Sequence, residues 1–108
     1  MKIVHMTEAE CTGTHLQGYI KTTYDKIVEV FGVPKYGPND GGDKVTCEWA
    51  VNIFYLDENE DEQMETVTIY DWHQYNTPFG EYRWHIGGLD SNAVAVVTAA
   101  MNMEAVYA

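Results

Sequence analysis

The residue types best suited to chemistry gather between Tyr70 and Gly88, in the stretch YDWHQYNTPFGEYRWHIGG. Asp71, His73 and His85 supply one carboxylate and two imidazoles, a set that can bind Zn²⁺ or Fe²⁺. Their spacing matches no established metal motif, so we predict no metal ligand and interpret both histidines as surface or hydrogen-bonded side chains. A role for His73 or His85 as a general base stays open as the enzymatic alternative.

The two cysteines do not predict a nucleophile. Cys47 lies in an alternating apolar run, which indicates a buried thiol, and Cys11 lies in a segment whose structure the sequence does not define. Free thiols are typical of a reducing cytoplasm. The chain also lacks a glycine-rich phosphate loop of the Walker or Rossmann type. We therefore expect no catalytic residue and no cofactor, and a binding protein rather than an enzyme.

A planar anionic ligand suits the same stretch better. Aromatic faces stack on bases, worth about 1–3 kcal/mol per base, and the guanidinium of Arg83 can pair with phosphate. Lys44 can add charge, and the backbone N–H groups of Gly87 and Gly88 can form an anion-binding turn before the last helix. The predicted ligand-binding residues are Tyr70, Trp72, His73, Tyr82, Arg83, Trp84 and His85. In the alternative interpretation, Trp72 and Trp84 only anchor the core of a small sheet.

The charge is strongly unbalanced, with seventeen acidic and six basic residues and a net charge of -11. Direct binding to DNA or RNA is therefore not expected, because it needs a basic face. An acidic surface can instead imitate nucleic acid toward a protein partner, or keep the chain in solution. The densest run, DENEDE from Asp57 to Glu62, predicts a solvated connection between two strands.

Hydrophobic periodicity predicts the elements that position these residues. We expect helices over Thr22–Phe31, capped by Thr22 and ended by Gly32, and over Ser91–Glu104, capped by Asp90 or Ser91. Strands are expected over Val45–Leu56, Glu65–Trp72 and Glu81–Ile86, with Gly87 and Gly88 ending the last one. Ile3 and Val4 can begin a short strand, and Gly13–Ile20 is expected to be extended or turned. The fold class is α+β, an antiparallel sheet of three or more strands with two helices packed on one face.

The 108 residues predict a single domain spanning 1–108. No apolar run approaches the length of a membrane span, and the N-terminal residues lack the apolar core of a signal peptide. These features favour a cytoplasmic protein that does not contact membranes. The last predicted helix carries a broad apolar stripe, from which we expect a homo-oligomer, with a dimer favoured.

The pattern GTHLQGYI…TTYDKIVEVFG…DKVTCEW…TIYDW…GEYRWHIGG resembles a family of small bacteriophage-encoded proteins of unsettled function. The resemblance covers about Thr12 to Gly88 and is most specific in IYDW and YRWHIGG. The chain departs from the pattern in its long GPNDGG and DENEDE segments and at His73, where the family has lysine. The resemblance implies phage origin and expression in the cytoplasm of a bacterial host.

Small acidic phage proteins without catalytic motifs are often inhibitors of host defence, so the resemblance suggests two hypotheses. The first is an inhibitor that binds and sequesters a small nucleotide-derived signal. The alternative is an acidic protein-binding inhibitor that imitates nucleic acid toward a defence nuclease or effector complex. The sequence does not identify the ligand, the defence system or the oligomeric state.

Overall fold

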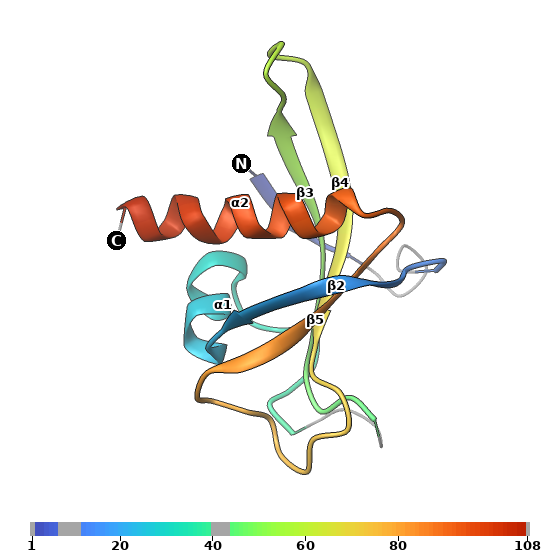
Figure 1. Ribbon diagram of the computed structural model, residues 1–108, viewed down its shortest axis with the longest axis vertical. Coiled ribbons are helices and arrows are strands. Elements are labelled where there is room, and N and C mark those ends of the chain that lie inside the picture. The colour runs from blue at the N-terminus through green and yellow to red at the C-terminus, as the bar shows by residue number, and fades with distance from the viewer. Residues whose placement is uncertain (1, 7–11, 40–43, 108) are drawn as a thin grey trace.

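The computed structural model describes residues 2–6, 12–39 and 44–107, which form one antiparallel sheet of five strands and two helices (Figure 1). The predicted α+β class is confirmed. In chain order the elements are β1 (Lys2–His5), β2 (His15–Thr22), α1 (Tyr24–Phe31), β3 (Glu48–Leu56), β4 (Glu62–Tyr70), β5 (Tyr82–Gly88) and α2 (Asn92–Tyr107). The strands lie in the order β1-β3-β4-β5-β2, so that the two strands nearest the N-terminus form the two edges.

Alternation along the strands divides the sheet into two faces with different environments. On the first face, one hydrophobic cluster joins the two helices to the strands. Its strand residues are Trp49, Val51, Ile53, Val67, Ile69, Trp84 and Ile86, and its helix residues are Ile27, Phe31, Ala93, Val96, Val97, Ala100 and Met101. Because the strand residues of this cluster share one face by register, the cluster favours packing of both helices there. The opposite face, here called the second face, carries residues including Tyr19, Phe54, Met64, Tyr70, Arg83 and His85.

The helix α1 begins one residue later than its predicted cap. The side chain of Thr23 accepts a hydrogen bond from Lys26 N at 3.2 Å, which makes Thr23 the N-cap. Thr22, the predicted cap, still belongs to β2 and pairs with Tyr82. The predicted end is confirmed, since Gly32 has a φ of 83° and its N–H donates to the carbonyl of Val28.

Gly87 and Gly88 are the last two residues of β5, so the strand ends at the predicted glycines but includes them instead of stopping at Ile86. Both glycines pair with β2 on one side and β4 on the other. A Cβ on Gly87 would lie 2.3 Å from Thr68 Oγ1, and one on Gly88 would lie 2.5 Å from Ala93 Cβ. Glycine is needed here for close packing. The predicted anion-binding turn at these residues is wrong, because their backbone belongs to the strand ladder.

One buried carboxylate lies where β3 starts later and β4 ends earlier than predicted. The N–H groups of Thr46 and Cys47 donate to Asp71, and β3 begins at Glu48 rather than Val45. Asp71 in turn lies just beyond β4, which runs from Glu62 to Tyr70 instead of Glu65 to Trp72. The hairpin of β3 and β4 reaches well beyond the rest of the fold, at the top of Figure 1.

The last helix begins near the predicted cap, since Asn92 N donates to Asp90 Oδ1 at 3.0 Å. Its backbone continues past the predicted end at Glu104, to Tyr107. The apolar side chains Ala93, Val96, Val97, Ala100 and Met101 are buried inside this chain. These five side chains are therefore not available for a contact between copies, and the homo-oligomer stays a prediction. No helix within the described ranges is long and apolar enough to cross a membrane.

Candidate functional site

Five rings from three strands and one loop form an aromatic cluster on the second face: Tyr19, Tyr70, Trp72, His73 and His85. The imidazole of His85 lies at its centre. It stacks on Tyr70 with 5.4 Å between ring centroids and a 27° interplanar angle, and it meets Tyr19 edge-on at 4.9 Å. The ring of Trp72 follows, 6.3 Å from His85 and 5.0 Å from His73. Trp72 is 41% exposed, so this part of the cluster faces solvent.

Two of the six basic residues of the chain contact rings of this cluster, and a third lies beside one of them. The guanidinium carbon of Arg83 lies 3.9 Å from the centroid of Tyr19, and Lys44 Nζ lies 5.8 Å from the centroid of Trp72. Lys21 is the register partner of Arg83 and forms an exposed ion pair with Glu81 at 3.2 Å. Arg83 and Lys44 thus bring positive charge to the aromatic cluster, in a chain whose net charge is -11.

The structure brings five of the seven predicted site residues together and separates the other two. Tyr70, Trp72, His73 and His85 belong to the aromatic cluster, and Arg83 borders it. Trp84 points to the opposite face, where it is fully buried 5.5 Å from Trp49.

Tyr82 also points away from the cluster and packs against Trp84. It contributes only indirectly, because its hydroxyl accepts a hydrogen bond from the backbone N–H of Trp72 at 3.1 Å. Tyr82 and Trp84 therefore support the site from behind and do not line its exposed surface.

The prediction did not include Tyr19, although this residue borders both His85 and Arg83. In the sequence, Leu16, Gly18 and Ile20 alternate with Tyr19 and Lys21. This alternation is typical of a strand, and it indicates that Tyr19 and Lys21 share one face. Its placement beside β5 depends on the pairing of residues more than sixty positions apart. No local pattern reports that pairing.

A buried polar network holds the loops that carry Trp72 and His73. The fully buried Asp71 accepts hydrogen bonds from Thr46 N at 2.7 Å, from Cys47 N at 3.2 Å and from the hydroxyl of Thr46. The Thr46 hydroxyl also lies 2.7 Å from that of Thr77. Thr77 and Asn39 then exchange two hydrogen bonds at 2.7 and 2.9 Å. These contacts fasten the loops before β3 and after β4 to each other.

His73 adopts a backbone conformation that is uncommon for a residue with a side chain. Its φ is 55°, in the left-handed region, while its N–H donates to the carbonyl of Lys44 at 2.8 Å. Such strained residues persist where the surroundings hold them, and they concentrate at functional sites. The same contact keeps Lys44 next to the ring of Trp72.

Burial sets the protonation states of the titratable groups in this region. Burial, reinforced by the charge of Arg83, lowers the pKa of His85, so the ring is neutral near pH 7. Its Nδ1 is buried and has no hydrogen-bond partner among the described residues. Burial raises the pKa of Cys47 to about 12, which keeps the thiol protonated and supports its predicted structural role. Burial also raises the pKa of the Tyr70 hydroxyl.

The metal alternative finds no support in the arrangement of the side chains. The oxygens of Asp71 are directed at Thr46 and Cys47 rather than at His73 or His85. Within residues 2–6, 12–39 and 44–107, no group of three His, Cys, Asp or Glu side chains is placed to hold a metal ion. Cys11 lies outside the described residues.

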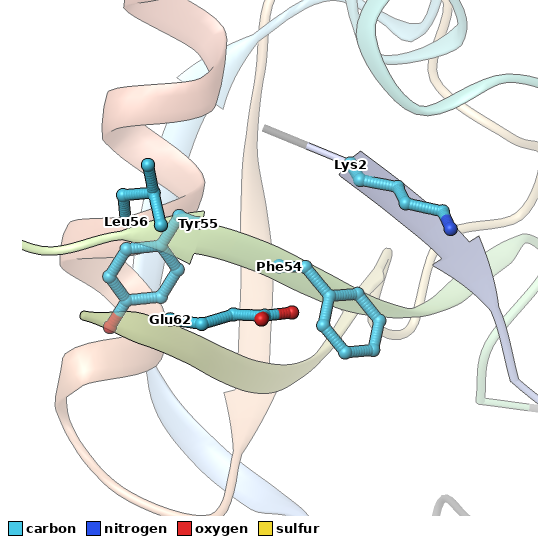
Figure 2. A pocket seen from close by; sticks show the side chains of 5 residues that line it. All are labelled: Lys2, Phe54, Tyr55, Leu56 and Glu62. Atoms are coloured by element: carbon cyan, nitrogen blue, oxygen red, sulfur yellow. The ribbon is translucent and has the colours of Figure 1, made fainter. Parts of the chain in front are cut away.

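A cavity of about 400 Å³ lies away from the aromatic cluster, next to the tip of the β3–β4 hairpin (Figure 2). It is lined by Lys2, Phe54, Tyr55, Leu56 and Glu62. The register of β1 with β3 ends where Lys2 faces Phe54, so this cavity lies at an edge of the sheet. It is considered separately below.

Comparisons with protein families, with curated proteins and with solved structures found no match for this chain.

Proposed function

We propose that this chain binds a small planar anion of the nucleotide type on its aromatic cluster, and sequesters that ligand without converting it. The observation that carries the proposal is the contact of Arg83 and Lys44 with the rings of the aromatic cluster. Carboxylates greatly outnumber basic groups in the chain as a whole. At the cluster, the aromatic faces suit the base of a nucleotide and the cations suit its phosphate.

Each part of the cluster has a distinct role in the proposal. The exposed face of Trp72 stacks on the base, and the neutral ring of His85, fixed against Tyr70, extends the apolar platform. The guanidinium of Arg83 presents a planar pair of donors to a phosphate, which a lysine cannot reproduce. Lys44 adds a flexible charge beside Trp72.

The biological role in this proposal comes from the resemblance to bacteriophage proteins. An inhibitor of a bacterial defence system would act in the host cytoplasm by lowering the free concentration of a nucleotide-derived signal. Sequestration needs affinity and abundance, and it needs no general base or metal. A homo-oligomer built through a sheet edge would place two clusters in one assembly, and β1 and β2 are the edges in question.

A thermal-shift screen against cyclic nucleotides and ADP-ribose derivatives tests the proposal first. A ligand present at 100 times its Kd stabilises the fold by about 2.7 kcal/mol, which is readily detected. Calorimetric titration then compares Arg83→Ala with the matched control Lys21→Ala. Both residues are exposed and face each other in register. We expect Arg83→Ala to weaken binding about tenfold or more, and Lys21→Ala to weaken it less.

Stability separates this proposal from a purely structural role of Arg83. Its contact with Tyr19 is a surface cation–π pair, worth about 0.5–1 kcal/mol, so the variant should melt close to the original chain. An Arg83→Ala chain that melts early and binds the screened ligand normally would contradict the proposal.

A second candidate function, an acidic inhibitor that contacts a protein, is favoured by the tip of the β3–β4 hairpin. Asp57, Glu58, Glu60, Asp61 and Glu62 lie on this projecting part of the sheet (Figure 1). A projecting row of carboxylates can imitate a nucleic-acid backbone toward a basic groove of a defence nuclease or effector complex. Neutralising this tip would abolish such an activity and leave nucleotide binding intact.

A further inference from the structure

We infer that the cavity next to the tip of the β3–β4 hairpin is an anchor site for one apolar side chain of a basic protein segment. The inference deepens the second candidate function and rests on it. It adds a specific requirement, because imitation of nucleic acid needs carboxylates alone, whereas an anchor site also needs an apolar side chain on the partner.

The shape and lining of the cavity provide the apolar part of the argument. Residues of β1, β3 and β4 border an open hollow of about 400 Å³ (Figure 2). Phe54, Tyr55 and Leu56 are three consecutive residues of β3, and all three contribute to its wall. Leu56 is 66% exposed, and the neighbouring Met64, which faces Phe54 across the hairpin, is 52% exposed. Apolar side chains left this open gain free energy when a partner covers them.

The charge around the cavity identifies the partner. Glu62 lines the wall, and Figure 2 shows its carboxylate directed toward Phe54. Asp57, Glu58, Glu60 and Asp61 follow directly on the hairpin tip, and no lysine or arginine occurs between Val45 and Tyr82. Lys2 is the one basic residue in the lining. An apolar hollow bordered by carboxylates fits a segment in which Lys or Arg flank a Leu, Phe or Met.

The same charge argues against other occupants. A small anion or a nucleic acid would be repelled by the tip. A second copy of this chain would bring an equally acidic hairpin to the cavity, and like charges at an interface oppose association. A basic protein segment meets no such opposition, and its cations would also relieve the mutual repulsion of the tip carboxylates.

Two synthetic peptides test the inference on the full chain. One is lysine-rich with a single central Phe, and the other carries Ala in place of that Phe. Titration of the isotope-labelled chain followed by NMR reports both affinity and location. We expect the Phe peptide to bind about tenfold tighter than the Ala peptide, because one aromatic side chain is buried, and to shift the amide signals of Phe54, Leu56 and Glu62.

Matched variants assign that difference to the cavity. Leu56→Ser removes an exposed apolar wall and should reduce the tenfold preference for Phe to nearly none. Leu89→Ser is the control, since Leu89 is 55% exposed and does not line the cavity, and it should keep the preference. A third variant, Glu58→Gln with Asp61→Asn, should weaken both peptides equally.

The outcomes separate the inference from the function on which it rests. Equal affinities of the two peptides, together with weaker binding after charge neutralisation, would overturn the anchor site and leave imitation of nucleic acid standing. Binding of both peptides that ignores charge neutralisation would overturn both. A preference for the Phe peptide that survives in Leu56→Ser would show that the cavity does not hold the Phe side chain, and it would overturn the inference. Self-association that depends on Leu56, seen by light scattering, would show that the exposed apolar residues contact a second copy of the chain, and it would also overturn the inference.

Discussion

The aromatic cluster and the tip of the β3–β4 hairpin lie at opposite ends of β4, and one aspartate organises each of them. Asp71 accepts two backbone N–H groups and one hydroxyl, while Asp57 accepts the N–H groups of Asn59 and Asp61 and the amide of Gln63. Asp71 is fully buried and reaches residues about twenty-five positions away. Every partner of Asp57 lies within six residues, at the surface.

The number of hydrogen bonds therefore does not decide how much each aspartate contributes to the stability of the fold. The partners of Asp71 are removed from water, so losing the carboxylate would leave buried donors unsatisfied, whereas the donors around Asp57 can bond to water instead. The cluster end is also backed by the core on the opposite face. A site that must hold rings in fixed positions has this kind of support, while a charged tip does not need it.

The largest expected effect concerns the core behind the aromatic cluster. Trp84→Ala removes a fully buried indole that packs on Trp49 and Tyr82, and we expect a loss of about 3–5 kcal/mol in the free energy of unfolding. Met64→Ala on the hairpin, which removes a half-exposed side chain, should change it by less than about 1 kcal/mol. Urea denaturation measures both. Similar losses in the two variants would show that the hairpin is supported as well as the cluster.

The two aspartates provide the most direct test of the comparison. Asp71→Asn should lower the free energy of unfolding by about 2–3 kcal/mol, because one acceptor oxygen becomes an NH₂ group facing buried donors. Asp57→Asn, the same change at the hairpin, should leave the denaturation midpoint nearly unchanged. Equal midpoint shifts would mean that hydrogen-bond count outweighs burial in this fold.

A smaller effect is expected from pH at the aromatic cluster. Burial and Arg83 lower the pKa of His85 in the folded chain, while an unfolded histidine titrates near its usual value of about 6.5. Below that pH the unfolded state binds the proton first, so the contribution of His85 is present above about pH 6.5 and is lost as the pH falls.

This pH effect is measured by comparing His85→Gln with the original chain. The melting temperature of the original chain should decline relative to that of the variant between neutral and mildly acidic pH. NMR titration of the imidazole gives the pKa directly. A pKa of His85 at or above that of an unfolded histidine would contradict the burial of its ring.

The smallest effect on stability is expected at the hairpin tip. Replacing Glu58, Asp61 and Glu62 with their amides, and Glu60 with Gly, should leave the melting temperature unchanged or slightly higher. Repulsion between exposed carboxylates is relieved, and glycine accepts the φ of 64° found at Glu60. Calorimetry checks this result. A clear drop in melting temperature would show that the tip carboxylates stabilise the fold, and the two ends would then differ less than proposed.

Local patterns in the sequence determined most of the secondary structure. The helix ending at Gly32, the alternation through Trp49, Val51 and Ile53, and the charged connection after Leu56 follow from side-chain periodicity and turn chemistry, which act over a few residues. Alternation likewise places the exposed Arg83 on the face opposite the buried Trp84. These features need no knowledge of distant contacts.

Tertiary structure decided which aromatic residues share a surface. Strand alternation sends Tyr82 and Trp84 to one face and Arg83 and His85 to the other, so a stretch that is continuous in sequence is divided by the sheet. The pairing of β2 with β5 then adds Tyr19, and the burial of Asp71 fixes the loop of Trp72 and His73. Such long-range pairing depends on the packing of the whole sheet, which no window of neighbouring residues contains.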